Sequence, residues 1–442
     1  MSNASLVRVL ARAFLTGERA PDAVAARGAQ ALGHNWPWLG PVARRYVAQF
    51  AGQARPRHRD VVRFLLADRG FQKARHRHRG RLGIADWLIG SQPMLPVAAA
   101  ASWDLPSIDS AGSLAAWLGV GTSELDWFAD LNWLARFAPD SRLSHYRYRV
   151  LVKRTGGVRL IEAPKDRLKT LQRLILSSIL DRIPPHPAAH GFVRARSIRT
   201  FAAPHVGRHI LLRVDMQDFF PSISATRVQA MFRTAGYPES VADLLGGICT
   251  NAVPRAVWRE APTAAEPAEL REARALYTRP HLPQGACTSP ALANICAWRL
   301  DCRLAGLAET CGATYTRYAD DLAFSGDAAF ERGIGRFASY VAVIAREEGF
   351  AVNHRKTRIM RQGARQHLAG LVANQRLNVP RAEFDLLKAI LTNCARFGPE
   401  SQNRKQHPRF RAHLEGRVAF LESINRTKAQ RLRAILDRIT WE

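Results

Sequence analysis

The chain has 442 residues, of which 47% are apolar, and this length suffices for two or three folded domains. Its 65 basic residues outnumber the 37 acidic ones, which gives a formal net charge of +28. A GC-rich genome would explain why 57 of the basic residues are Arg, but it would not explain the shortage of acids. The excess charge therefore favours a polyanionic partner, and nucleic acid is preferred over a membrane surface.

Several classes of protein are disfavoured by the same sequence. No run of about 18 apolar residues occurs, and residues 1–20 have arginines scattered among apolar residues, so neither a transmembrane helix nor a signal peptide is expected. The six cysteines include no CxxC pair, which argues against a zinc ribbon and against a disulfide framework. We therefore expect a cytoplasmic protein that does not contact a membrane.

The chain is expected to contain three consecutive regions. Residues 1–100 are rich in Ala and Arg at helical spacing, which indicates a basic, mostly helical N-terminal extension. Residues 101–372 alternate short apolar strands with helical stretches. Residues 373–442 contain 14 basic and 7 acidic residues, a pattern that predicts a basic helical bundle suited to gripping a duplex.

Individual elements can be placed within the second and third regions. The segment Thr155-Gly156-Gly157 lies between two apolar stretches and is typical of a β-hairpin turn. The other expected elements are helices over 113–118, 124–137, 168–180, 290–304, 384–394 and 410–424, a buried strand over 210–214, a second hairpin over 314–325, and a surface loop at 261–267.

Three carboxylates are the main candidates for catalysis. Asp320 and Asp321 are adjacent at the turn of the second predicted hairpin, where two acids are unfavourable unless a cation neutralises them. Asp215 ends the buried strand and supplies a third acid. Such a set could hold two divalent ions about 4 Å apart, and Mg²⁺, which Mn²⁺ could replace, suits it. An ordinary Asp-rich turn is the alternative; Asp218, three positions after Asp215, is expected to point to the opposite face of the strand.

The order of motifs around these acids resembles that of reverse transcriptases. Asp215 with its Phe219-Phe220-Pro-Ser-Ile223 tail is similar to motif A, and the segment 282–290, Leu-Pro-Gln-Gly-Ala-Cys-Thr-Ser-Pro, is similar to motif B. Tyr318-Ala-Asp-Asp321 is similar to motif C. Gly349-Phe350, followed by Asn353 and Lys356-Thr357, is similar to motif D. All four occur in the order of the family over some 140 residues.

The resemblance extends to the retron group of reverse transcriptases, from about Leu114 to the C-terminus. The segments that carry it are Tyr146-Arg-Tyr148, Lys153-Arg-Thr-Gly-Gly157, Arg159-Leu-Ile161, Ala163-Pro-Lys165, Leu171-Gln-Arg173, His190-Gly-Phe192 and Arg196-Ser-Ile198. Two segments depart from the retron pattern. Phe201-Ala-Ala-Pro-His205 stands where Asn-Ala-x-x-His is frequent, and Leu368-Ala-Gly370 replaces the Val-Thr-Gly that is associated with choosing the RNA.

This resemblance implies an α+β fold of the right-hand polymerase type. Fingers and an antiparallel palm sheet would occupy residues 101–372, and a helical thumb would occupy residues 373–442. The implied reaction is RNA-directed DNA synthesis from dNTPs on a structured non-coding RNA, through an RNA–DNA hybrid. In retrons the product is branched RNA–DNA primed from a 2′-hydroxyl, and the setting is phage defence with an effector protein.

The resemblance also assigns roles to individual residues. Catalysis is assigned to Asp215, Asp320 and Asp321, and metal binding to these three with Met216. Phe220 would exclude a 2′-hydroxyl by its bulk, and Lys356 would protonate the departing pyrophosphate, although each could equally serve as a core or surface residue. The full set expected to bind the nucleotide is Lys153, Arg159, Phe220, Gln284, Gly285 and Lys356, with Lys153 and Arg159 on the triphosphate and Gln284 and Gly285 lining the pocket.

Two alternative functions stay open at this point. The chain could belong to another bacterial defence lineage of reverse transcriptases that uses no retron RNA. It could also be an RNA-binding scaffold without catalysis, but such a protein would have no need for three mutually repelling acids. Primer extension on an RNA template separates the enzyme from the scaffold.

Overall fold

The computed structural model describes residues 3–53, 56–78, 80–85, 92–137, 144–152, 158–260 and 266–441. Internal contacts divide the chain into two compact units, each assembled from two separate stretches. Unit 1 comprises Met1–Ile183 and Ser224–Thr288, and unit 2 comprises Pro184–Ile223 and Ser289–Glu442. The three consecutive regions expected from the sequence remain a prediction. Within the described part of the chain, no helix is both long and apolar enough to cross a bilayer.

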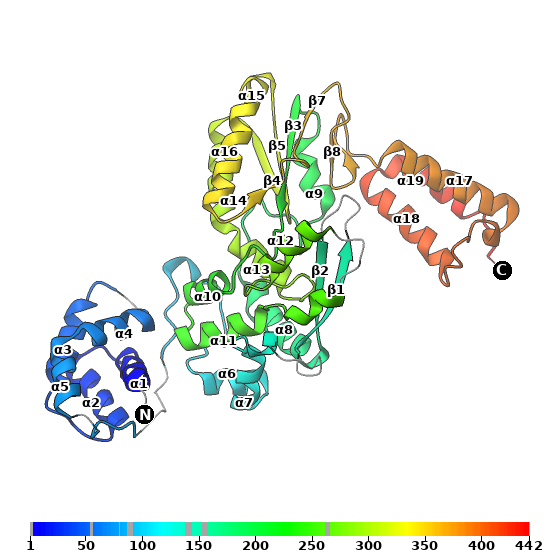
Figure 1. Ribbon diagram of the computed structural model, residues 1–442. Coiled ribbons are helices and arrows are strands. Elements are labelled where there is room, and N and C mark those ends of the chain that lie inside the picture. Colours follow the sequence, from blue (N-terminus) through cyan, green and yellow to red (C-terminus); the bar gives the residue numbers. More distant parts are fainter. Residues whose placement is uncertain are drawn as a thin grey trace. The chain divides into compact units, whose positions relative to one another are not determined.

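Five helices form the N-terminal part of unit 1, drawn in blue in Figure 1. They are α1 (Asn3–Leu15), α2 (Pro21–Leu32), α3 (Leu39–Gln49), α4 (His58–Ala67) and α5 (Arg69–Arg77). Each turns its apolar stripe inward, and the buried side chains, among them Phe14, Tyr46 and Phe71, form a core cluster. The helical spacing of this segment therefore predicted its secondary structure correctly.

The rest of unit 1 combines one β-hairpin with helices. The helices are α6 (Ala111–Leu118), α7 (Thr122–Ala129), α8 (Asp166–Ser178), α10 (Ala225–Thr234), α11 (Glu239–Cys249) and α12 (Pro267–Tyr277), with 3-10 turns at Ala98–Ala100, Leu134–Phe137, Leu180–Arg182 and Arg255–Glu260. The hairpin pairs β1 (Tyr146–Val152) with β2 (Val158–Pro164) in antiparallel register and confirms the first predicted hairpin.

Two predicted elements of unit 1 differ from the structure. The helix expected over 124–137 ends at Ala129, because Asp130 adopts a left-handed backbone with φ of 37°. Of the loop expected at 261–267, residues 261–265 lie outside the described residues, and Pro267 already begins α12 with its ring at the first helical position.

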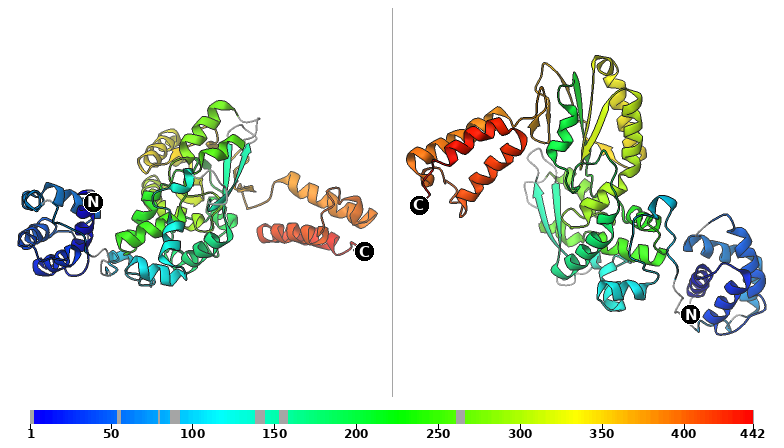
Figure 2. Two further views of the ribbon diagram at one scale, coloured as in Figure 1. Left: turned by 60° about the horizontal axis from the view of Figure 1, so that its bottom comes forward. Right: turned by 180° about the vertical axis from the view of Figure 1, so that it is seen from behind.

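Unit 2 is built on a five-stranded antiparallel sheet in the order β4-β5-β3-β6, with β7 also paired to β3. Its strands are β3 (Ile210–Gln217), β4 (Thr314–Tyr318), β5 (Asp321–Gly326), β6 (Ala351–Val352) and β7 (Arg358–Arg361). Helices α14 (Trp298–Thr310) and α16 (Ile334–Glu347) lie along one face of this sheet (Figures 1 and 2). The buried strand and the second hairpin are thus confirmed.

Shorter elements complete the sheet region. They are α9 (Ile198–Ala202), a 3-10 turn at Ala203–His205, α13 (Ser289–Cys296), α15 (Ala328–Arg332), and the small pair β8 (His367–Leu368) and β9 (Leu371–Val372). The single helix expected over 290–304 is two helices, because the chain leaves helical geometry at Ala297 between α13 and α14.

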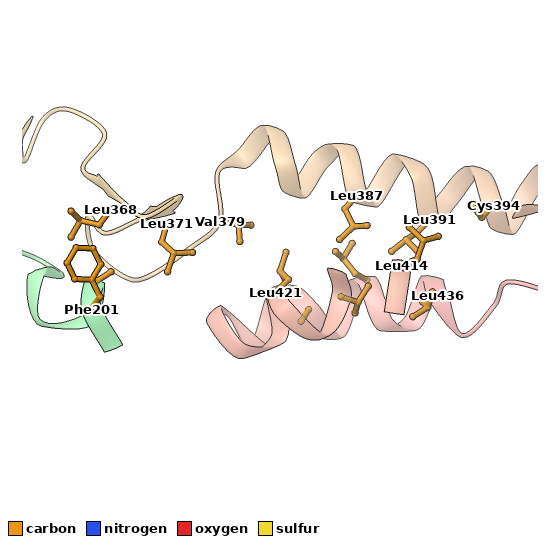
Figure 3. Packing of buried hydrophobic residues seen from close by; sticks show 14 of the residues in the cluster. Phe201, Leu368, Leu371, Val379, Leu387, Leu391, Cys394, Leu414, Leu421 and Leu436 are labelled. Atoms are coloured by element: carbon orange, nitrogen blue, oxygen red, sulfur yellow. The ribbon is translucent and has the colours of Figure 1, made fainter. Parts of the chain in front are cut away.

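The C-terminal part of unit 2 is helical, as its sequence predicted. It contains α17 (Arg381–Phe397), a 3-10 turn at Pro399–Ser401, α18 (Phe410–Ile424) and α19 (Arg426–Leu436). Figure 3 shows Leu387, Leu391 and Leu414 facing one another between these helices, within a cluster that continues through Val379 to Phe201. Helix α19, whose buried side chains are Ala429, Leu432 and Leu436, was not among the individual helices expected from the sequence.

Candidate active site

The three acids predicted for catalysis lie side by side at one end of the unit 2 sheet. Asp215 in β3 is the direct cross-strand partner of Asp321 in β5. The backbone amide of Met216 donates a 2.9 Å hydrogen bond to the carbonyl of Asp320. Directly paired residues on antiparallel strands project their side chains to the same face of a sheet. The pairing therefore brings together acids that are separated by more than a hundred residues in the chain.

The electrostatics of this cluster are those of crowded, half-buried carboxylates. Burial, reinforced by the negative charges of Asp321 and Asp215, raises the pKa of Asp320 to about 6. Burial also raises the pKa of Asp321, although the nearby Arg213 acts in the opposite direction. Such uncompensated negative charge is what a bound divalent cation relieves, so the chemistry of these oxygen ligands fits a hard metal ion.

Two side-chain cations contact the cluster. The Lys356 ammonium lies 3.1 and 3.2 Å from the two carboxylate oxygens of Asp215, so it neutralises this acid where a metal ion would. Arg213 donates to both oxygens of Asp321 at 2.8–3.0 Å. In the described part of the chain, no three acidic, His or Cys side chains already surround a single point as metal ligands. Lys356 therefore occupies the carboxylate oxygens of Asp215 in this structure.

Met216 and Asp218 occupy the positions that follow Asp215. The side chain of Met216 is buried, and a thioether is a poor ligand for a hard cation, so only its backbone carbonyl could serve a metal. Asp218 lies just beyond the end of β3 and has φ of 46°. The reason predicted for excluding it, a strand alternation, does not apply, because the strand has already ended.

A buried arginine, Arg317, supports the turn that carries the two adjacent acids. Ala319 adopts φ of 55°, a left-handed conformation that is unfavourable for a residue with a side chain. The Arg317 guanidinium donates to the Ala319 carbonyl at 3.2 Å and to Asn294 Oδ1 at 3.0 Å. Asp301 accepts two further bonds from it. Side chains from α13 and α14 thus hold Arg317 in the position from which it stabilises the turn.

Gly191 is in close contact with the same turn. A Cβ atom at this position would lie 2.6 Å from the Ala319 amide nitrogen, which no side chain could accommodate without moving the backbone. Asn294 Nδ2 fixes Gly191 through a 2.8 Å bond to its carbonyl. The sequence predicted the His190-Gly191-Phe192 segment only as part of the resemblance to retron enzymes. The structure adds the contact between Gly191 and Ala319.

Phe220, predicted to select the sugar, follows the acid cluster in a turn. Its ring is half-buried and lies 6.2 Å from the ring of Phe192 between centroids. Phe192 is 52% exposed and also lies 6.3 Å from the ring of Tyr318. The three rings form an apolar surface next to the carboxylates. Phe192 could not have been recognised from the sequence, because its neighbours are distant in the chain.

The remaining nucleotide-binding candidates belong to unit 1. Arg159 is exposed on β2, whereas Lys153 lies outside the described residues. Gln284 accepts a 2.9 Å backbone hydrogen bond from Glu162 through its carbonyl. Gly285 has φ of 134°, and a Cβ there would lie 2.8 Å from the Glu162 carbonyl oxygen. The contact with β2 therefore requires glycine at 285, and its expected place in the nucleotide pocket stays a prediction.

A buried acid joins the hairpin to this loop. Glu162 and His281 are both inaccessible to solvent, and His281 Nε2 lies 2.8 Å from Glu162 Oε1. Asn251 Nδ2 donates to the other Glu162 oxygen at 3.3 Å and to the Tyr148 hydroxyl at 3.1 Å. This hydrogen-bond network connects β1 and β2 to the segment that carries Gln284.

Comparison with known proteins agrees with this geometry. Residues 151–397 match the family model described as reverse transcriptase (RNA-dependent DNA polymerase). Retron Mx65 reverse transcriptase from Myxococcus xanthus is 42% identical over 338 residues, which cover 75% of this chain and 72% of the relative. Retron Mx162 reverse transcriptase from the same organism is 36% identical, with coverage of 76% and 67%.

A more distant relative from another bacterium shows the same relationship. Retron Ec86 reverse transcriptase from Escherichia coli is 28% identical over 299 residues, which cover 66% of this chain and 82% of the relative. The family has the right-hand polymerase fold, which agrees with the mixed helices and antiparallel sheets seen here, and its members use divalent metal ions. With its catalytic motifs in the family order and three retron enzymes among its relatives, the chain belongs to the reverse transcriptases of the retron type and is an RNA-directed DNA polymerase.

Proposed function

We propose that this polymerase uses Asp215, Asp320 and Asp321 as its catalytic acids, with two Mg²⁺ ions that Mn²⁺ can replace. The observation that carries this proposal is the direct pairing of Asp215 with Asp321 and of Met216 with Asp320. The ions would be held by the three carboxylates and the Met216 carbonyl, and when bound they would lower the pKa of the attacking hydroxyl and stabilise the leaving group.

The residues of the chain then have distinct tasks in one reaction. The primer hydroxyl oxygen forms a bond to the α-phosphorus of the dNTP, the bond to pyrophosphate breaks, and the hydroxyl proton passes to solvent water. Arg159 and Lys153 bind the triphosphate oxygens, and Gln284 with Gly285 lines the nucleotide pocket. Phe220 excludes a ribose 2′-hydroxyl. Lys356, whose ammonium group contacts Asp215, would donate a proton to the departing pyrophosphate.

At the level of biology, we propose the retron pathway. The enzyme would copy a structured non-coding RNA into single-stranded DNA, start from a 2′-hydroxyl of that RNA, and act in the cytoplasm. The resulting branched RNA–DNA would take part in phage defence with an effector protein. Support comes from relatives named as retron reverse transcriptases, two of which are at least 36% identical over about three quarters of this chain.

Two measurements test these levels separately. Primer extension on a generic RNA template with Mg²⁺ tests the polymerase, and tight RNA binding without incorporation would favour an inactive scaffold. Sequencing the nucleic acid that co-purifies with the protein tests the pathway. A discrete RNA joined through a 2′ linkage to a short DNA is expected, whereas free DNA without a linked RNA would favour another defence lineage.

A further inference from the structure

The N-terminal helices lie outside the segment that matches the reverse transcriptase family, which begins at residue 151. Residues 1–85 contain 16 Lys and Arg but only 4 Asp and Glu, a net charge of +12. These helices have their own buried core, and none of the catalytic candidates belongs to them. Their charge therefore calls for an explanation separate from the active site.

Helix α5 concentrates this charge on one face. Asp68 caps the helix by accepting a 2.8 Å hydrogen bond from the Phe71 amide, and Phe71 and Ala74 are buried against the core. On the other side, four exposed residues are spaced at i, i+4, i+7 and i+8, which places them along one helix face. These residues, Arg69, Lys73, His76 and Arg77, are called the cationic stripe below.

A further cation, Arg45, adjoins the stripe and is held in place. Arg45 on α3 donates to both carboxylate oxygens of Asp68, at 2.7 and 2.9 Å. Its guanidinium lies across Gly70, so close that a Cβ atom there would lie 2.3 Å from Arg45 Nη2. The Arg45 side chain nevertheless remains 47% exposed. It therefore presents a pre-oriented cation at the first turn of α5.

The stripe is unfavourable for the helix that carries it. Arg69 lies at the N-terminal end, where the helix dipole disfavours positive charge, and Arg69–Lys73 and Lys73–Arg77 are like-charge pairs four residues apart. Among the described residues, no carboxylate pairs with Arg69, Lys73 or Arg77. The dipole explains basic residues in the last turn, but it does not explain Arg69. An external anion would relieve this repulsion.

We propose that the cationic stripe binds the phosphodiester backbone of the RNA on which this polymerase acts. Nine residues of helix span about 13 Å, enough to follow several phosphates of a nucleic-acid backbone. A membrane surface is a poorer match, because an interfacial helix needs an exposed apolar face and the apolar residues of α5 are buried. RNA is preferred to DNA because the template must be held before any DNA exists. The proposal rests on the RNA-directed activity but not on the retron pathway.

The test compares two double variants of the full-length chain. Lys73→Gln with Arg77→Gln removes two exposed cations from the stripe. Arg8→Gln with Arg12→Gln removes two exposed cations at the same spacing from α1, with the same change in net charge. Binding of a 60-nucleotide hairpin RNA is measured without dNTPs across a range of salt concentrations. The stripe variant should lower the slope of log K against log [salt] by about 1.4–1.8, since each lost phosphate contact contributes about 0.7–0.9.

The α1 variant should keep the wild-type slope. Extension of a saturating, pre-annealed template–primer should be unchanged in both variants, because the stripe lies outside the catalytic residues; this readout separates the proposal from the polymerase function. Equal slopes for the stripe variant and the wild type would overturn the proposal, as would equal losses in both variants. A loss seen with hairpin DNA or phosphatidylserine vesicles, but not with RNA, would reassign the surface.

Discussion

Arg317 and Asp301 form an ion pair from which solvent is fully excluded on both sides. Arg317 Nε lies 2.7 Å from Asp301 Oδ1, and Nη2 lies 2.6 Å from Oδ2. The Tyr315 hydroxyl donates to the same carboxylate at 2.7 Å. Because Arg317 also donates to the Ala319 carbonyl, this pair connects α14 with the turn that carries two of the proposed catalytic acids.

Breaking this pair should affect both stability and catalysis. Asp301→Asn leaves the Arg317 charge buried without its partner, and we expect a loss of about 3–5 kcal/mol in the free energy of unfolding, measured with urea. Replacing both partners, Arg317→Met with Asp301→Leu, should recover much of that stability. Primer extension should be slow in the double variant, because the Ala319 carbonyl there loses its Arg317 donor. Full recovery of the extension rate would show that the pair has only a structural role.

Removing the acids at the hairpin turn should abolish synthesis. For Asp320→Asn combined with Asp321→Asn, the loss of several kcal/mol of metal-dependent stabilisation corresponds to a rate decrease of about 10³-fold or more. RNA affinity should be unchanged or higher, because two negative charges have been removed. Asp218→Asn is the control and should remain active. Substantial extension by the double variant would refute the assignment of the metal ligands.

Shortening Phe220 should weaken the selection of deoxynucleotides. Phe220→Ala opens space beside the Phe192 ring, and we expect the ratio of kcat/KM for dNTP over rNTP to fall by about 10- to 100-fold. Single-nucleotide incorporation with each sugar measures this ratio. Phe219→Leu, at a buried position, should lower stability but keep the ratio. Unchanged discrimination in Phe220→Ala would remove its role as a steric gate.

A buried histidine should make the stability of unit 2 depend on pH. His205 Nδ1 and Nε2 each lie 2.7 Å from a hydroxyl oxygen, of Ser325 and Thr316 respectively. Burial, together with the charges of Arg208 and His190, lowers the pKa of His205 from 6.5 to about 3. Between pH values of about 3 and 6.5, the unfolded chain therefore binds a proton on His205 that the folded chain does not bind. The stabilisation by His205 is complete above pH 6.5 and is lost as the pH falls, by about 1.4 kcal/mol per unit.

Urea unfolding from pH 4.5 to 8 measures this dependence. His205→Gln removes the titrating group but keeps an amide that can bond to the hydroxyls, so its free energy of unfolding should vary less steeply below pH 6.5. The difference between the two slopes should approach one proton. Parallel slopes for the variant and the wild type would mean that His205 takes up its proton equally well in the folded chain.

The hairpin that carries Asp320 and Asp321 was predictable because its signal is local. Tyr318 and Asp321 are the last cross-strand pair before the turn, and the apolar run Leu322–Phe324 follows directly. The same holds for β1 and β2. Asp215 could be placed at the end of a strand for the same reason, but the family resemblance was needed to bring it beside Asp321.

The cations around the acids could not be predicted, because nothing local identifies their partners. Arg213 and Asp321 are 108 positions apart, and Lys356 and Asp215 are 141 positions apart. The resemblance to motif D placed Lys356 near the departing pyrophosphate, but the sequence holds no signal for its contact with Asp215 or for that of Arg213 with Asp321. The end of α13 was also not predicted, because apolar residues continue across Ala297, where the backbone leaves helical geometry.

The contact between Glu162 and the 281–285 segment has a mechanical consequence. Burial lowers the pKa of His281, but the Glu162 carboxylate more than compensates, so the net shift of this pKa is upward. The contact between His281 and Glu162 and the backbone bond from Glu162 to Gln284 together fasten β2 to the 281–285 segment. If Arg159 binds a triphosphate as proposed, a movement of β2 would be passed to Gln284 through the backbone bond from Glu162.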